Sequence, residues 1–190
     1  MTKIAIIYHS GYGHTEVQAK YVQKGAASVD GVEAKLFKVE DIKNATELNE
    51  FKAIIFGAPT YMGSVSAQFK AFMDATSGVW FAQQWKDKIA AGFTNSNSMS
   101  GDKFNSLVQL VTFAAQHGMI WTSLGELNHS SVPNAENGGG EYVNRIGSYL
   151  GAMAQSDNAP TDQTPPIGDL KTAEILGQRV ANIAKRFVDA

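Results

Sequence analysis

The sequence predicts an α/β fold in which one parallel sheet is covered by helices on both faces. Short runs of apolar and mostly β-branched residues recur along the chain, for example at residues 4–8 and 53–59. Such runs are typical of parallel strands that are buried on both faces. Segments with apolar residues at helical spacing alternate with them, as the crossovers of a parallel sheet require. No internal repeat or linker is evident, so we expect residues 1–190 to form a single domain.

The first half of the chain predicts three strands and one long helix. Residues 4–8 are the first strand, and a helix begins at Thr15. Residues 32–37 alternate more strongly, which favours a strand at the edge of the sheet. The polar residues 40–50 are expected to form a loop with a short helical turn. Residues 53–59 repeat the buried pattern, and Gly and Pro end this third strand.

The second half continues the alternation. Ser66 is expected to cap a helix by accepting a bond from its first turn. Residues 88–94 are the fourth strand, residues 104–117 the next helix, and residues 119–121 open the fifth strand. The apolar face of residues 172–188 predicts the closing helix.

Ligands of such sheets bind beyond the carboxyl ends of the strands. The loops that follow the strands are therefore the expected site of the chemistry. Residues 128–166 are rich in Gly, Asn, Ser and Pro, and loops of this length without regular structure are usually functional or mobile.

Composition excludes several classes of function. The net charge is −2 and cysteine is absent, so no nucleic-acid partner is expected, thiol chemistry is excluded, and redox chemistry needs a cofactor. No metal-ligand spacing of His and carboxylates is evident, so no metal is expected. No run reaches the roughly 18 apolar residues of a membrane span. The chain enters its first strand without a signal peptide, and we expect a cytoplasmic protein.

The loop after the first strand has the features of an anion site. Backbone N–H groups at the start of a helix lack partners and attract a phosphate. Gly11 and Gly13 permit close approach, and the hydroxyls of Ser10 and Thr15 add donors. The loop lacks Gly-Lys-Ser/Thr, which disfavours a P-loop nucleotide hydrolase, and it lacks a full Gly-x-Gly-x-x-Gly, which disfavours a dinucleotide site.

Two further loops are expected beside this one. Residues 58–64 follow the third strand and residues 94–101 follow the fourth. A flavin needs apolar or aromatic surface against its ring and polar groups near its edge. Tyr61, Met62 and many small polar residues meet both requirements.

Four separated motifs stand in an order that matches a known family. They are Ser-x-Tyr-Gly-His-Thr after the first strand, Gly-Ala-Pro-Thr-Tyr-Met-Gly-Ser after the third, residues 74–80 ending in Gly-Val-Trp, and His-Gly-Met at residues 117–119. Together they resemble the WrbA family of FMN-dependent NAD(P)H:quinone oxidoreductases, over nearly the whole chain. The resemblance implies a flavodoxin-like three-layer sandwich with a five-stranded parallel sheet in the order 2-1-3-4-5.

The resemblance also implies the cofactor and its contacts. FMN would bind with its phosphate at residues 10–15, and NAD(P)H would reduce it. Tyr12 would lie near the nicotinamide, His117 would contact the flavin, and Trp80 would cover the substrate site, often from a neighbouring subunit. Family members are commonly tetramers, so a homodimer or homotetramer is expected, with a quinone or similar small acceptor. The implied cofactor-binding residues are Ser10, Gly11, Tyr12, Gly13, His14, Thr15, Pro59, Thr60, Tyr61, Met62, Gly63, Asn95, Ser96, Asn97, Ser98, Met99, Ser100 and His117.

Plainer interpretations stay open beside these. Tyr12 is also explained as a surface aromatic on a turn, and His117 as a histidine favoured by the dipole at a helix terminus. Trp80 and Trp85 fit either an exposed interface or the core. For the whole protein, the alternatives to an oxidoreductase are a flavodoxin-type electron carrier and a regulatory FMN-binding module.

Overall fold

A parallel sheet forms the centre of the molecule, as the sequence predicts. The computed structural model describes residues 1–129 and 139–187. β1 (Thr2–Tyr8) pairs in parallel with β2 (Val32–Lys38) and with β3 (Ala53–Tyr61), and β3 pairs in parallel with β5 (Ile89–Ser96). The strand order is β2-β1-β3-β5-β6. The sequence predicts no strand at β4, so β5 and β6 are its fourth and fifth strands. The observed order is therefore the expected order 2-1-3-4-5.

The fifth position in the sheet differs from the prediction because two short strands share it. β6 (Ile120–Trp121) pairs with the first residues of β5, and β7 (Ala152–Gln155) pairs with its last four. The chain leaves the sheet between them. β7 lies inside the segment that was expected to be a loop, because its sequence Ala-Met-Ala-Gln has no β-branched residue to indicate a strand.

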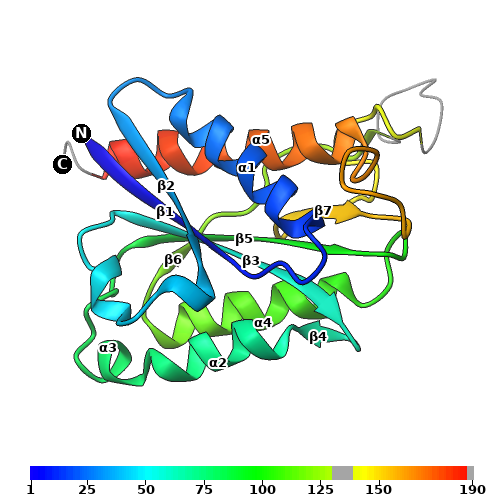
Figure 1. Cartoon of the computed structure of the whole chain (residues 1–190). Helices are drawn as coiled ribbons and strands as arrows, with labels where there is room; N and C mark the ends of the chain where they lie inside the picture. Colours follow the sequence, from blue (N-terminus) through cyan, green and yellow to red (C-terminus); the bar gives the residue numbers. More distant parts are fainter. Residues whose placement is uncertain (130–138, 188–190) are drawn as a thin grey trace.

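A small hairpin extends β3 beyond the sheet. β4 (Ser64–Val65) pairs antiparallel with Thr60 and Tyr61. A two-residue strand is too short to produce a pattern in the sequence. The hairpin lies at the end of the molecule to which β3 and β5 point (Figure 1).

Helices cover both faces of the sheet. α1 (His14–Ala27) and α5 (Ile167–Arg186) lie on one face, while α2 (Ala67–Ala75), α3 (Ser77–Phe81) and α4 (Lys103–Gln116) lie on the other (Figure 1). Each layer encloses its own apolar cluster against the sheet. Within the described part of the chain, none of these helices is long and apolar enough to span a membrane.

α1 and α5 pack closely because a glycine faces a carbonyl on each side. A Cβ atom on Gly25 would lie 1.8 Å from the carbonyl oxygen of Glu174, and one on Gly177 would lie 1.9 Å from that of Val22. Neither distance is compatible with a side chain. The contact brings α1 down onto the sheet and thereby places its first turn above the end of β1.

Several local predictions need correction. Residues 40–50 contain two 3₁₀ helices, η1 (Val39–Asp41) and η2 (Ala45–Leu48), rather than one turn. Ser66 precedes α2, but its hydroxyl makes no capping bond. α5 begins at Ile167, five residues before the predicted start, and the predicted end of this helix at residue 188 lies outside the described residues.

Candidate functional site

A cavity of about 330 Å³ opens where β1, β3, β5 and β7 end. Its volume lies within the range of small-molecule sites in proteins, roughly 300–1,000 Å³. Four loops contribute to it, as expected at the carboxyl edge of a parallel sheet. The lining residues are Ser10, Tyr12, His14, Thr15, Pro59, Thr60, Tyr61, Asn95, Ser96, Asn97, Ser156, Asn158 and Ala159.

The loop between β1 and α1 presents backbone amides to this cavity. The hydroxyl of Ser10 accepts a bond from the Glu16 amide at 3.1 Å and so fixes the first turn of α1. Within residues 1–129 and 139–187, no acceptor is found for the amides of Tyr12 and Gly13. The first amides of a helix have no intrahelical acceptor either. This cluster of free donors at the positive end of a helix is suited to a phosphate.

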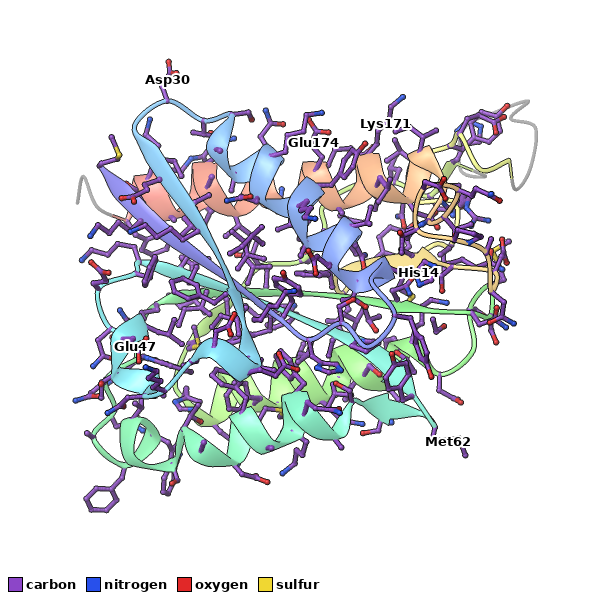
Figure 2. All side chains as sticks on the ribbon, in the orientation of Figure 1. His14, Asp30, Glu47, Met62, Lys171 and Glu174 are labelled. Carbon is purple, nitrogen blue, oxygen red and sulfur yellow. The ribbon has the colours of Figure 1, made fainter. Side chains whose placement is uncertain are left out.

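Gly13 is required at the end of this loop for two reasons. Its φ of 92° lies in the left-handed region, which other residues adopt at a cost. A Cβ atom there would also lie 2.9 Å from the methyl group of Thr161. The next residue, His14, begins α1 and places Nε2 at 2.7 Å from the carbonyl oxygen of Ala159 (Figure 2). The segment that follows β7 therefore closes over the anion loop.

Two tyrosines border another side of the cavity. The rings of Tyr12 and Tyr61 meet edge to face, with 6.2 Å between their centroids. The Tyr61 hydroxyl lies against Gly11, and burial raises the pKa of this phenol above its ordinary value, an effect that the Gly11 backbone opposes. Tyr61 thus links the loop after β3 to the anion loop. The pair offers aromatic surface beside a polar pocket.

Buried hydroxyl groups hold the loop after β3 against α4. Thr60 donates a bond to Ser106 and accepts one from Thr94, each at 2.8 Å. Thr94 and Ser106 are completely buried. This chain of hydroxyl groups fixes the floor of the cavity without any charge.

Asn95 has an amide oxygen to which no described residue donates a hydrogen bond. The side chain is 4% exposed, and its Nδ2 donates to the Ser156 hydroxyl at 3.1 Å. Its Oδ1 is buried and finds no donor among the described residues. A buried acceptor of this kind costs free energy unless a bound molecule supplies a donor. Because Asn95 lines the cavity, the residues present fit a ligand with both an anionic group and a ring that donates hydrogen bonds.

Some of the predicted contacts lie near the cavity without lining it. Met62 stands at the tip of the β3–β4 hairpin, fully exposed and pointing away from the sheet (Figure 2). Apart from His117, the other predicted residues outside the lining are Gly11, Gly13, Gly63, Ser98, Met99 and Ser100. All of them belong to the same three loops as the predicted residues that line the cavity.

His117 does not reach the cavity within a single chain. It follows α4, whose 14 residues carry it about 20 Å from the helix start near the cavity. There it is 2% exposed, stacks on Trp85 with centroids 4.6 Å apart, and has Nε2 at 2.9 Å from the Thr76 hydroxyl. Burial lowers its pKa to about 4. It is a neutral core residue at the opposite edge of the sheet.

Trp80 is also remote from the cavity within one chain. It lies in α3, at the opposite end of the molecule from the β3–β4 hairpin (Figure 1), and is 43% exposed. Its neighbour Phe81 is 84% exposed, whereas Trp85 is completely buried. The aromatic cluster thus divides into a core residue and two surface residues. Only a second subunit could bring Trp80 to a cavity.

The sequence interpretation missed three lining residues, which are Ser156, Asn158 and Ala159. They follow β7, which pairs with the last residues of β5 and therefore ends at the same edge. A strand prediction at residues 152–155 would have identified them. The only available signal was the unusual length and composition of the loop at residues 128–166.

Comparisons with known proteins identify relatives of this chain. The family model described as NADPH-dependent FMN reductase matches residues 45–131. The chain is 42% identical to Flavodoxin FldP of Pseudomonas aeruginosa, over 98% of this chain and 99% of that protein. It is 34% identical to the quinone oxidoreductase QR2 of Triphysaria versicolor, over 98% and 97% of the two chains. Among solved structures, a WrbA-like flavodoxin from Agrobacterium tumefaciens is 39% identical with a TM-score of 0.73, covering 98% of this chain and 99% of that one.

The fold, the cavity and these relatives define a flavodoxin-like α/β protein. Identity of more than 30% over almost the full length extends this conclusion from the fold to the family. The chain belongs to the WrbA family of flavodoxin-like FMN-dependent oxidoreductases, which use NAD(P)H as reductant.

Proposed function

We propose that this protein carries two electrons from NAD(P)H through FMN, bound in the cavity at the ends of β1, β3, β5 and β7, to a quinone or a similar small acceptor. The observation that carries the proposal is the cluster of free amides between β1 and α1, beside a cavity with aromatic and polar walls. The name of the Triphysaria relative, a quinone oxidoreductase, supports the acceptor class.

The residues of the chain bind and orient the cofactor in this proposal. Free amides at residues 12–15, with the Thr15 hydroxyl, hold the phosphate. Tyr12 and Tyr61 border the ring, and Asn95 accepts a hydrogen bond from its polar edge through Oδ1. FMN supplies the redox chemistry, since it accepts a hydride equivalent and passes electrons on. The protein contributes position and a fixed polar environment.

The open side of the cavity is where NAD(P)H and the acceptor would dock in turn. Tyr12 is 80% exposed at this rim, and Met62 projects from the neighbouring hairpin. These exposed apolar groups are available to contact a nicotinamide or a quinone ring. We further infer subunit contact through Trp80 and Phe81 in a homodimer or homotetramer, because large exposed aromatics are enriched at interfaces.

Anaerobic mixing tests the proposed reaction. FMN-loaded protein is mixed with NADPH or with NADH, and the visible absorbance of the flavin is followed. We expect this absorbance to disappear much faster than for free FMN, and to return when a quinone is added. Flavin that stays oxidised with both nucleotides would refute the oxidoreductase function.

The second candidate is an electron carrier between proteins, which the flavodoxin name of the Pseudomonas relative favours. A carrier of this kind would need a separate reductase protein, whereas an enzyme reduces quinone in the presence of NAD(P)H alone. Carriers usually use a strong acidic field for docking, and a net charge of −2 provides little. Steady-state quinone reduction by the purified protein alone separates the two candidates.

A further inference from the structure

Lys103 is a completely buried lysine beneath the loop that follows β5. It is the first residue of α4, and its Nζ donates to three successive carbonyl groups. These belong to Ser98, to Met99 at 3.3 Å and to Ser100 at 3.5 Å. The Ser96 hydroxyl, on the cavity wall, donates to the same Ser98 carbonyl at 3.5 Å. Lys103 is thus connected to the cavity wall through the Ser98 carbonyl, which it shares with Ser96.

In the part of the chain that the structure describes, the positive charge of Lys103 has no close counter-ion. Among the described residues, no carboxylate lies within 4 Å of its Nζ. The nearby Asp169 is already paired with Arg145 at 2.9 Å, and both of these side chains are buried. The buried cations Lys103 and Arg145 therefore share the buried carboxylate of Asp169. A buried charge without a partner is costly, so this arrangement favours an anion bound nearby.

The three carbonyl contacts also determine where the backbone amides of the loop point. In a trans peptide the N–H lies opposite the C=O. Because the carbonyls of residues 98–100 converge on Lys103, the amides of Met99, Ser100 and Gly101 point away from it, on an exposed loop. None of these amides has an acceptor in the described part of the chain. Successive free amides of this kind attract electron-rich groups.

We propose that Lys103 is a positioning residue of the flavin site: it holds the carbonyls of residues 98–100 so that the amides of residues 99–101 face FMN, and its positive charge makes FMN affinity depend on pH. The inference rests on the FMN binding proposed above. It adds the residue that organises the loop and the charge that favours a phosphate ester.

The direction of the pH dependence follows from the surroundings of Lys103. Burial lowers the pKa of Lys103 to about 8, an effect that Arg145 reinforces and that Asp169 and Asp157 oppose. Above this pH the lysine loses its charge, and FMN affinity falls. Stability changes in the opposite sense, because the unfolded chain holds this proton up to its ordinary pKa of 10.5. The contribution of Lys103 to the free energy of unfolding therefore rises as the pH increases from about 8 to 10.5.

The test compares Lys103→Met with a matched control, Lys88→Met. Lys88 precedes β5 at the opposite edge of the sheet and donates to the carbonyls of Asn49 and Phe51 at 2.7 and 2.6 Å. Both substitutions remove an ammonium group that binds backbone carbonyls, but only one lies beneath the loop after β5. FMN dissociation constants are measured from about pH 7 to about pH 9.5, with circular dichroism to verify folding.

For the wild type and Lys88→Met we expect FMN affinity to fall as the pH rises through the pKa of Lys103. For Lys103→Met we expect binding weaker by about tenfold near neutral pH, the size of one charge-assisted hydrogen bond, and no fall at higher pH. In FMN-free protein, hydrogen exchange at residues 98–101 should be faster in Lys103→Met than in either other protein. If the methionine variant fails to fold, Lys103→Arg takes its place, and it should bind FMN at every pH without the alkaline loss.

Unchanged affinity and an unchanged pH profile in Lys103→Met would overturn the inference and leave the proposed function intact. The same holds if Lys88→Met weakens binding as strongly as Lys103→Met, because the effect would then be general. Failure of the wild type itself to bind FMN would refute the proposed function first. These results are distinguishable because each concerns a different protein.

Discussion

Single buried polar residues have different roles at the two edges of the sheet. At the carboxyl edge, Asn95 faces the cavity and has an amide oxygen without a partner among residues 1–129 and 139–187. At the opposite edge, His117 also has a ring nitrogen without a partner, but it faces only the core. The Thr76 hydroxyl donates to the Met73 carbonyl, so it accepts from Nε2–H of His117 and Nδ1 is left as the lone acceptor. Asn95 is therefore suited to binding a ligand, whereas His117 is suited to a neutral core.

His117 predicts a loss of stability in acid. Its pKa in the folded protein is about 4, below the ordinary value of 6.5, so the unfolded chain binds the proton more tightly. The contribution of neutral His117 to stability is therefore fully present above its ordinary pKa of 6.5 and is lost as the pH falls toward about 4. We expect the free energy of unfolding to fall by about 2–3 kcal/mol more in the wild type than in His117→Phe over this range. Urea denaturation at several pH values measures it.

The same variant tests where His117 lies. Because the structure places it far from the cavity, His117→Phe should bind FMN with the affinity of the wild type. A marked loss of affinity in a folded variant would restore His117 as a flavin contact. Equal acid sensitivity of the two proteins would show that His117 does not carry the proton linkage.

At the scale of elements, the position of α1 depends on its contact with α5. The first turn of α1 supplies the amides of the anion loop, and the glycines at positions 25 and 177 allow the two helices to approach. The opposite layer has no such requirement at Gly78 in α3, where a Cβ atom would meet nothing within 4 Å. Glycines in these helices therefore differ in whether the packing requires them.

Alanine substitutions measure that difference. Gly177→Ala should destabilise the protein by about 2–3 kcal/mol, because the new methyl group overlaps a backbone carbonyl and the helices must separate. Gly78→Ala should be neutral or stabilising by up to about 1 kcal/mol, since alanine is the better helix former. Denaturant unfolding of both variants gives the comparison. Equal effects would show that the packing of α1 on α5 is looser than the structure indicates.

The sequence predicts the elements wherever a pattern is long enough. β1, β3 and β5 were predicted because buried parallel strands read as continuous apolar runs, and their loops followed directly. β4 and β7 were not predicted, since two or four residues without β-branching carry no periodic signal. The residues that follow β7 were therefore not predicted either, although they close the cavity over His14.

At the scale of the whole molecule, the site combines residues that sequence reasoning finds with others that only the structure brings together. The anion loop is recognisable because its glycines and hydroxyls adjoin a strand and a helix. Lys103 is not recognisable, because lysines are almost always exposed and only the folded loop shows why this one is buried. The position of His117 is not recognisable either, because a family motif gives only an order along the chain, whereas α4 carries the residue away from the cavity of its own chain.

In the proposed function, free amides and hydroxyls between β1 and α1 hold the phosphate, and no lysine is among the groups that contact it. The most direct test is the affinity of the wild-type protein for FMN compared with riboflavin, which has the same ring and no phosphate, by titration of flavin fluorescence. With several charge-assisted hydrogen bonds at stake, riboflavin should bind at least about a hundredfold more weakly than FMN. Equal affinities, or no binding of FMN, would contradict the account.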